Sequence, residues 1–357
     1  MKILTLRIKP MEPLLFRGPG EFDPSSRGVY SQALSLYLPR PSTIVGALIS
    51  YLLTVKADKE PNLISRCTLL NSFNDYLECM GKALDSIGVI ALRGPYLYDT
   101  SREAIYVPIR LGVKLRLVDY DQLCGYLYNN KDLLDALLEH EIGEDKLTRL
   151  KWIERELERF EARGYEILRT GVMLRDRLEA GRIAREGYLY TVKYVAYPEN
   201  IELRFKVVLS ESNSLESKEP SLDTSLNIGG ERRIARIVLE HSEDRIDSVL
   251  SEKRGEADSE YYLLLSPMPL KNRDVLQENY IGALDIIGLG FSIARRRRKP
   301  LYPALLEGSI LRVKPGKRYL EGLLHHGLYN FLAVEDNELK VLARMGYASA
   351  IPLIQRY

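Results

Sequence analysis

Cysteine and histidine, which supply most protein metal sites and many catalytic nucleophiles and bases, are scarce in this sequence. The three cysteines, Cys67, Cys79 and Cys124, form no CxxC pair, so neither a zinc site nor a disulfide framework is indicated. Only four histidines are present, and no P-loop, HExxH or GxSxG pattern stands in a convincing context. We therefore expect no catalytic residue, no metal and no cofactor.

The sequence also lacks a strong net charge and a long apolar run. Lysine and arginine number 51 against 49 aspartates and glutamates, a net charge of +2. Any affinity for a polyanion must therefore come from local clusters of cations. The longest weakly polar run, Ile44 to Val55, is too short to span a bilayer, and the N-terminus carries no signal-like segment. We expect a cytoplasmic, reduced protein with no membrane partner.

What remains is the composition of a globular protein with two cores. The chain has 357 residues, of which 45% are apolar and 28% charged. The charged, aperiodic stretch 241–260 is interpreted as a linker, which separates an N-terminal module (1–245) from a C-terminal module (258–357). A turn with glycines and arginines occurs at 229–239 and again at 288–298, which favours two related α+β modules.

The N-terminal module is expected to carry a helical insert and an arm. The insert, at about 132–163, has helical spacing on one side and dense charge elsewhere. The arm, at about 168–209, begins with arginines and continues as a hairpin of strands 188–197 and 201–209. Further strands are expected at 4–8, 14–16, 89–98, 104–118, 234–239 and 261–265, helices at 44–55 and 62–87, and a short helix before Gly229.

The first candidate binding site is the approach to the helix at 44–55. Ser42 or Thr43 can cap that helix with a hydroxyl. Its N-terminus carries a partial positive charge beside Arg17, Arg27 and Arg40, a combination that suits a phosphate. The alternative is a strand-loop-helix unit whose arginines face water.

The second candidate is a basic loop in the C-terminal module. Gly288 and Gly290 let a backbone approach a ligand closely. They precede five consecutive cations, namely Arg295, Arg296, Arg297, Arg298 and Lys299. Arginine forks match phosphate oxygens, so this run indicates contact with an RNA or DNA backbone. A solvated loop is the alternative, and a dinucleotide site is weaker because the third glycine of that fingerprint is absent.

The third candidate is the turn Gly229-Gly230-Glu231-Arg232-Arg233. Two glycines before a strand can present a row of backbone N–H groups to a phosphate, with Arg232 and Arg233 beside them. The alternative is a glycine that ends a helix, next to surface arginines.

These motifs together resemble a known family. Phe16-Arg17-Gly18-x-x-Glu21-Phe22 and the stretch Leu38 to Leu48 are similar to the N-terminal signature of the third subunit of the Cmr complex. That complex is the type III-B CRISPR RNA-guided effector, and the subunit belongs to the RAMP superfamily. Residues 229–233 resemble a further block of that family, and 288–298 resemble the glycine-rich RAMP loop.

The resemblance implies two ferredoxin-like (RRM-like) modules and a non-catalytic role in antiviral defence. Family members hold the 5′ tag of the guide RNA (crRNA), bridge the large polymerase/cyclase-type subunit to the backbone RAMP subunits, and meet target RNA indirectly. If the tag contacts of the family are carried over to this sequence, the residues near the tag are Arg17, Gly18, Ser42, Thr43, Gly229, Gly230, Arg232 and Arg233. Gly288 and Gly290 would form the RAMP loop.

Two other functions stay open from the sequence. One is a metal-independent RAMP endoribonuclease that processes repeat RNA with His325 or His326, although adjacent side chains on a helix or strand diverge. The other is a protein scaffold with no RNA contact of its own.

Overall fold

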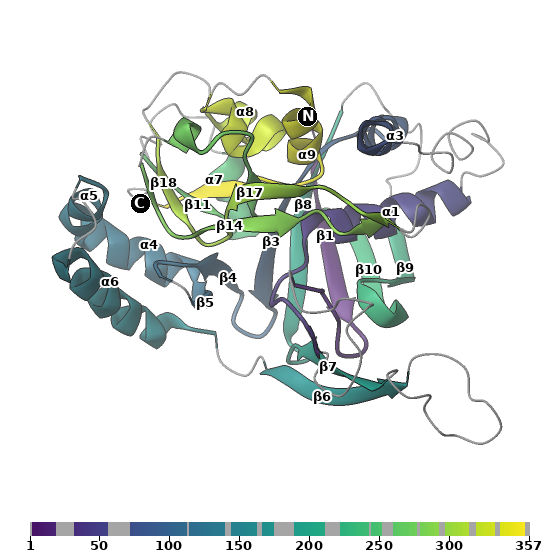
Figure 1. Ribbon diagram of the computed structural model, residues 1–357, viewed down its shortest axis with the longest axis horizontal. Helices are drawn as coiled ribbons and strands as arrows, with labels where there is room; N and C mark the ends of the chain where they lie inside the picture. The colour runs from purple at the N-terminus through teal and green to yellow at the C-terminus, as the bar shows by residue number, and fades with distance from the viewer. Residues whose placement is uncertain are drawn as a thin grey trace.

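The computed structural model describes most of the chain. The described residues are 2–18, 32–55, 72–112, 114–139, 144–162, 166–174, 189–210, 222–242, 244–251, 260–276, 279–292, 297–313, 319–332 and 336–353. Figure 1 shows a central sheet with the C-terminal part of the chain, from residue 260 on, stacked above it, a group of helices at one side and a small sheet below. None of the described helices is long and apolar enough to cross a membrane.

The central sheet has seven antiparallel strands in the order β5-β4-β3-β8-β1-β10-β9. Their bounds are β1 Lys2–Pro10, β3 Val89–Asp99, β4 Ala104–Ile109, β5 Arg116–Asp119, β8 Ile201–Leu209, β9 Leu222–Asn227 and β10 Ile234–Glu240. Helices α1 (Pro41–Val55) and α3 (Phe73–Ser86) cover one face, where Leu6, Val45, Leu84 and Val207 line an apolar cavity. The period-two pattern of β8 explains this layering, because Leu203, Phe205 and Val207 share the helix-facing side.

Helix α1 begins earlier than the sequence suggested. Its first residue is Pro41, which suits the first helical position because proline has no N–H to leave unpaired there. Ser42 and Thr43 therefore lie inside the first turn, and the expectation that one of them caps the helix was wrong. Helix α3 does carry a capping box, in which Ser72 accepts from the backbone N–H of Asp75 and Asp75 accepts from that of Ser72.

The helical insert lies beyond the β5 edge of the sheet (Figure 1) and starts before residue 132. It comprises α4 (Tyr120–Asn129), α5 (Lys131–Glu139) and α6 (Glu144–Leu157), followed by the 3-10 turn η1 (Glu158–Phe160). Asp119 caps α4 by accepting from the backbone N–H of Gln122 at 3.0 Å. The expected single strand 104–118 is in fact β4 and β5, with a break between them.

The predicted hairpin was wrong in its pairing. β7 (Leu189–Ala196) pairs with β6 (Glu166–Leu174) and with β2 (Gln32–Leu34), whereas β8 pairs with β1 and β3 in the central sheet. The reason is burial: residues 201–208 are buried on both faces of β8, so this strand needs neighbours on both sides. The arm is therefore the antiparallel pair β6–β7, which lies at the bottom of Figure 1.

Two further expectations need correction near the end of the expected N-terminal module. Residues 222–227 form the edge strand β9, not a helix, because partly buried and exposed side chains alternate along it. A 3-10 turn, Gly230–Arg232, then precedes β10. The expected linker 241–260 contains the helix α7 (Arg245–Ser251), while Leu14 and Arg17 make only isolated β-bridges, so 14–16 is not a regular strand.

The C-terminal part contains two small antiparallel sheets, ordered β13-β18-β11-β19 and β12-β17-β14. The strands are β11 Tyr261–Leu264, β12 Met268–Pro269, β13 Tyr280–Ile281, β14 Leu284–Gly288, β17 Leu301–Leu305, β18 Ile310–Arg312 and β19 Ala350–Pro352, with the hairpin β15 Phe291–Ser292 and β16 Arg297–Arg298 between β14 and β17. Helices α8 (Tyr319–His326) and α9 (Asn337–Arg344) lie between β18 and β19 in the chain.

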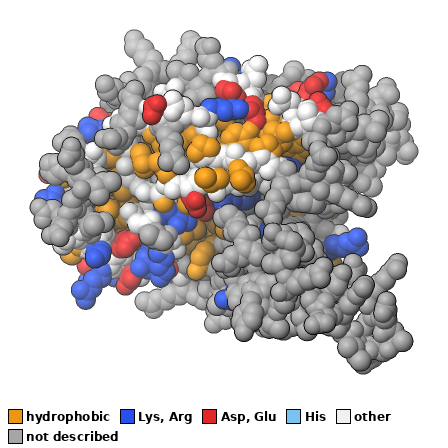
Figure 2. All heavy atoms as spheres, viewed as in Figure 1, with side chains coloured by type: hydrophobic (Ala, Val, Ile, Leu, Met, Phe, Trp, Pro, Cys, Tyr) orange, Lys and Arg blue, Asp and Glu red, His pale blue; other side chains and the backbone are white. Residues whose placement is uncertain are grey.

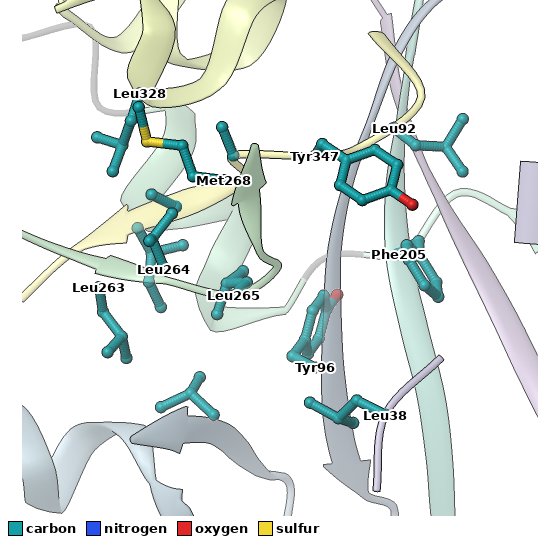
Figure 3. Packing of buried hydrophobic residues seen from close by; sticks show 14 of the residues in the cluster. Leu38, Leu92, Tyr96, Phe205, Leu263, Leu264, Leu265, Met268, Leu328 and Tyr347 are labelled. Carbon is teal, nitrogen blue, oxygen red and sulfur yellow. The ribbon is translucent and has the colours of Figure 1, made fainter. Parts of the chain in front are cut away.

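One hydrophobic core runs through both halves of the chain. Figure 3 shows Leu92 and Phe205 of the central sheet beside Tyr347, which precedes β19. Leu263 and Met268 of the C-terminal part belong to the same cluster. The guanidinium of Arg93, buried in β3, donates to the carbonyls of Leu323 (3.0 Å) and Ala343 (2.7 Å) near the ends of α8 and α9, and burial lowers its pKa to about 9.

The cysteines differ from expectation at one position. Cys124 is a buried free thiol, and burial raises its pKa to about 12. Cys79 forms a disulfide whose other half lies outside the described residues, so the expectation of reduced cysteines alone was wrong.

A buried network of charges fixes the linker to the central sheet. The ammonium of Lys206, which is fully buried, lies 3.1 Å from the carboxylate of Asp244 and also contacts Asp247. Asp244 further accepts from the hydroxyl of Tyr96 at 2.7 Å and lies 3.3 Å from the guanidinium of Arg204. Because each charge meets an opposite charge, the residues before α7 are held on the face of β8.

We expect Lys206→Ala to lower the free energy of unfolding by about 3–5 kcal/mol, because it leaves Asp244 buried without its main counter-charge. Urea-induced unfolding of the purified chain measures this loss. The control is Lys82→Ala, which removes an exposed helical ion pair with Glu78 and should change stability by about 0.5 kcal/mol or less. Equal losses in the two variants would contradict the assignment.

Candidate nucleic-acid interface

The segment that follows β1 joins three parts of the chain. Leu14 exchanges two backbone hydrogen bonds with Val195 of β7, each of 2.8 Å. The carbonyl of Leu15 accepts from the backbone N–H of Gly230 at 2.8 Å. Phe16 accepts from the N–H of Leu36 at 2.6 Å. Arg17 ends this segment, and its position is set by contacts with the sheet β2-β7-β6 and with the turn before β10.

The glycine turn at 229–230 fits against this segment because it has no side chains. Gly229 has a φ of +77°, and a Cβ placed on it would lie 2.4 Å from the carbonyl oxygen of Leu15. A Cβ on Gly230 would lie 3.5 Å from Nε of Arg17. Arg232, two residues further on, is exposed. The structure therefore brings Arg17, Gly229, Gly230 and Arg232 into one small region.

Arg233 is part of the support for this turn. Its guanidinium lies 2.6 Å from the carboxylate of Glu12 and 4.2 Å above the ring of Tyr194. A hydrogen bond from the backbone N–H of Ile234 lowers the pKa of Glu12, and a second one from the side chain of Arg233 lowers it further. The guanidinium thus joins three parts of the chain: the start of β10, strand β7, and the segment that follows β1. The roles of Glu12 and Tyr194 in this contact were not predicted from the sequence.

The start of α1 is packed against the C-terminal part. Arg40 lies 3.4 Å from the carboxylate of Glu307, which also lies 3.7 Å from Arg110. The hydroxyl of Ser42 contacts the carbonyl of Leu289 at 3.4 Å and accepts from the hydroxyl of Tyr347 at 3.1 Å. The anion beside Arg40 is thus a carboxylate of this chain, and the first turn of α1, with Thr43, adjoins the loop that contains Gly288 and Gly290.

That loop also packs against α3. The backbone N–H of Lys299 donates to the carbonyl of Gly290 at 2.9 Å. The ammonium of Lys299 lies 3.9 Å from the ring centre of Tyr76, and burial lowers its pKa to about 8. Gly290 is exposed, has a φ of +102°, and has no atom within 4 Å of the position that a Cβ would take. The backbone therefore stays open to a ligand at Gly290.

The remaining predicted contacts are only partly located. Gly18 directly follows Arg17 and is partly buried. Arg297 and Arg298 form β16, whose backbone pairs with β15, but their side chains lie outside the described part of the structure. Arg27, Arg295 and Arg296 lie outside the described residues.

The two adjacent histidines end helix α8. Their ring centres are 6.0 Å apart with planes inclined by 56°. The pKa of His326 is lowered chiefly by burial. It is lowered further by the neighbouring side chains His325, Arg93, Lys340 and Arg344. Among the described residues, no group of three or more histidines, cysteines or acids could hold a metal ion.

Comparisons with known proteins give a consistent result. The model of the family described as CRISPR-associated protein (Cas_Cmr3) matches residues 6–115 and 127–350. The CRISPR system CMR subunit Cmr3 of Saccharolobus solfataricus is 32% identical over 314 residues, which cover 85% of this chain and 84% of that protein.

Two solved chains are similar over almost the whole fold. One is from the type III-B Cmr-beta complex bound to cognate target RNA, with a TM-score of 0.62 and 26% identity over 98% of this chain and 96% of that chain. The other, from the same complex with target RNA and AMPPnP, has a TM-score of 0.60 and 25% identity over 96% of this chain and 94% of that chain.

We expect Gly229→Ala to destabilise the turn, because its Cβ would collide with the carbonyl of Leu15 and its φ is unfavourable for alanine. The loss should be about 1–3 kcal/mol, measured by thermal unfolding of the purified chain. Gly125→Ala is the matched control, since nothing lies within 4 Å of that Cβ and alanine favours a helix. A stable Gly229→Ala protein would show that the close approach is not required.

Proposed function

The chain belongs to the Cmr3 family and is a subunit of a type III-B CRISPR effector complex, and from this premise we propose that it is a non-catalytic RNA-binding subunit. It holds the 5′ tag of the guide RNA and bridges the large polymerase/cyclase-type subunit to the backbone RAMP subunits. Its contact with target RNA is indirect, through the guide and the neighbouring subunits.

The convergence of two distant cationic segments is the observation that carries the proposal. The net charge of +2 is too small to attract RNA at long range. Arg17 and Arg232 are both exposed, and the Leu15–Gly230 hydrogen bond brings their segments together. Two exposed guanidinium groups on adjoining segments suit phosphates of one strand, whereas a scaffold without RNA contact would not need them.

The strand order supports the ferredoxin-like part of the proposal. In the central sheet, β3, β8, β1 and β10 are neighbours, and in the C-terminal sheet β13, β18, β11 and β19 are neighbours. If the four strands of each set are numbered in chain order, their order across the sheet is 2-3-1-4 in both sets. All neighbouring pairs are antiparallel. This is the order of the βαββαβ ferredoxin-like sheet, so we propose one such module in each half.

The basic loop of the C-terminal module belongs to the same proposal. Gly288 and Gly290 lie beside the first turn of α1 through the contact of Ser42 with Leu289. The run Arg295 to Arg298 follows, and five neighbouring cations repel one another unless an anion is near. We therefore propose that this run meets RNA phosphates. Arg40 and Arg233, which are held by Glu307 and Glu12, support the two regions from behind.

Replacing both Arg17 and Arg232 with alanine should weaken guide-RNA binding about tenfold or more, since each charge-assisted hydrogen bond contributes about 1.5–3 kcal/mol. The slope of log K against log salt should flatten by roughly 0.7 for each phosphate that is no longer neutralised. Titration of labelled guide RNA at several salt concentrations, with the isolated chain and with the assembled complex, measures both quantities. The quadruple change of Arg295 to Arg298 forms a second arm with the same expectation.

The control is Arg102→Ala, because that arginine is exposed on the turn after β3 and makes only a 4.0 Å contact with Asp99. It should leave affinity and slope unchanged. If the Arg17/Arg232 variant behaved like this control, the two arginines would not be a phosphate site.

The alternative function, a metal-independent endoribonuclease, makes a separate prediction. The buried Nδ1 of His326 has no hydrogen-bond partner among the described residues, so no described acid orients its ring as a general base. We expect no cleavage when purified protein is incubated with repeat RNA in EDTA. Cleavage that His325→Ala or His326→Ala abolishes would establish the enzyme instead.

A further inference from the structure

The helical insert exposes the only tryptophan of the chain. The Trp152 side chain on α6 is 50% exposed. Its ring centre lies 6.5 Å from that of Tyr126 on α4, which in turn lies 6.0 Å from that of Phe160. Tyr126 thus packs beside the indole and is itself packed against Phe160, while the indole stays half exposed. An exposed aromatic platform of this kind can stack on a flat partner.

Cations flank Trp152 on the same helix. Arg149 and Arg155 are three residues before and after it, which places them about 60° to either side of it around an ideal helix. Lys151 is its immediate neighbour, and all three cations are exposed. Within the described part of the chain, none of the three forms an ion pair.

Several acidic side chains of the insert contact groups other than the three cations around Trp152. The carboxylate of Glu154 lies against the backbone of Gly112, 2.8 Å from a Cβ placed there. Glu158 and Glu161 both pair with Arg116 of β5, at 2.6 and 2.8 Å. Glu156 pairs with Arg159 and Asp135 with Arg312. These five acids therefore stabilise the insert itself or hold it to the body, and none of them pairs with Arg149, Lys151 or Arg155 beside Trp152.

This combination fits single-stranded RNA better than a protein. The apolar residues that would form the centre of a protein interface, such as Leu134, Leu137, Ile153 and Leu157, are buried inside the insert, and charged residues are depleted from such centres. An exposed ring between cations that form no ion pair is instead the pattern of sequence-tolerant binding to single strands. We propose that the outer face of α6, formed by Arg149, Lys151, Trp152 and Arg155, binds single-stranded RNA.

The surface is separate from the one proposed for the guide tag. The insert follows β5, whereas the Gly229 turn follows β9, and these strands are the two edges of the central sheet. Six strand spacings separate them, about 29 Å. Figure 1 draws α6 at the lower left, where Figure 2 shows several lysine and arginine side chains projecting with acidic ones between them. The inference thus goes beyond the proposed function and does not require the tag site.

The experiment uses the assembled complex with 4-thiouridine placed along either the guide or the target RNA. After irradiation, crosslinked peptides from residues 148–160 are mapped, and affinity for target RNA is measured against salt. The variants are Trp152→Ala, Trp152→Phe and the double change Arg149→Ala with Arg155→Ala. The control is Lys340→Ala, which truncates an exposed cation on α9.

Trp152→Ala should abolish crosslinks to the insert and weaken binding of the contacted strand about tenfold, the range found for loss of one stacked base. Trp152→Phe should retain most of the binding. The double arginine variant should flatten the salt slope by roughly 1.4, or 0.7 for each of two phosphates. Crosslinks from labelled guide or from labelled target would both support the proposal and would identify which strand is bound.

Unchanged crosslinking and affinity in all three variants would overturn the proposal. Release of a protein subunit from the complex by Trp152→Ala, with RNA affinity unchanged, would also overturn it and would identify the surface as a protein contact. The Arg17/Arg232 variant serves as a reference, because loss of tag binding there with intact crosslinks to α6 would show that the two surfaces act separately.

Discussion

The neutralisation of buried charge on β8 is the interaction on which the placement of Asp244 and Asp247 against the central sheet depends. β8 carries apolar residues on one face and Glu202, Arg204 and Lys206 on the other, and all of them are buried. A buried ammonium without a counter-charge is strongly unfavourable. Asp244 and Asp247 satisfy this requirement, so the residues that lead into the C-terminal part are held on the sheet.

The same requirement sorts the arginines of this protein into two kinds. Arg40, Arg116 and Arg233 each meet a carboxylate of the chain, and their role is to join segments. Arg232 on the glycine turn and the cations around Trp152 are exposed, and they can meet an external anion. With nearly equal numbers of acids and bases, any positive surface of this protein depends on which cations are left without a carboxylate partner, not on a large net charge.

The repeat in this chain is one of strand order more than of sequence. The glycine and arginine segments at 229–239 and 288–298 suggested two related modules. Yet the first segment precedes β10, the fourth strand of the set β1, β3, β8 and β10. The second lies between β13 and β18, the second and third strands of the set β11, β13, β18 and β19. The antiparallel order of the two sheets is what they share. The local similarity of the turns thus relates segments that are not equivalent in position.

The sequence by itself determined the α+β class, the positions of β1, α1, β8 and β10, and the family, because local periodicity and short motifs depend on neighbouring residues only. It could not decide that β7 leaves β8 for another sheet, that Ser42 contacts Leu289, or that Arg40 meets Glu307. Those outcomes depend on which distant segment offers a partner for a buried surface or charge. Only the tertiary structure, where such partners compete, could settle them.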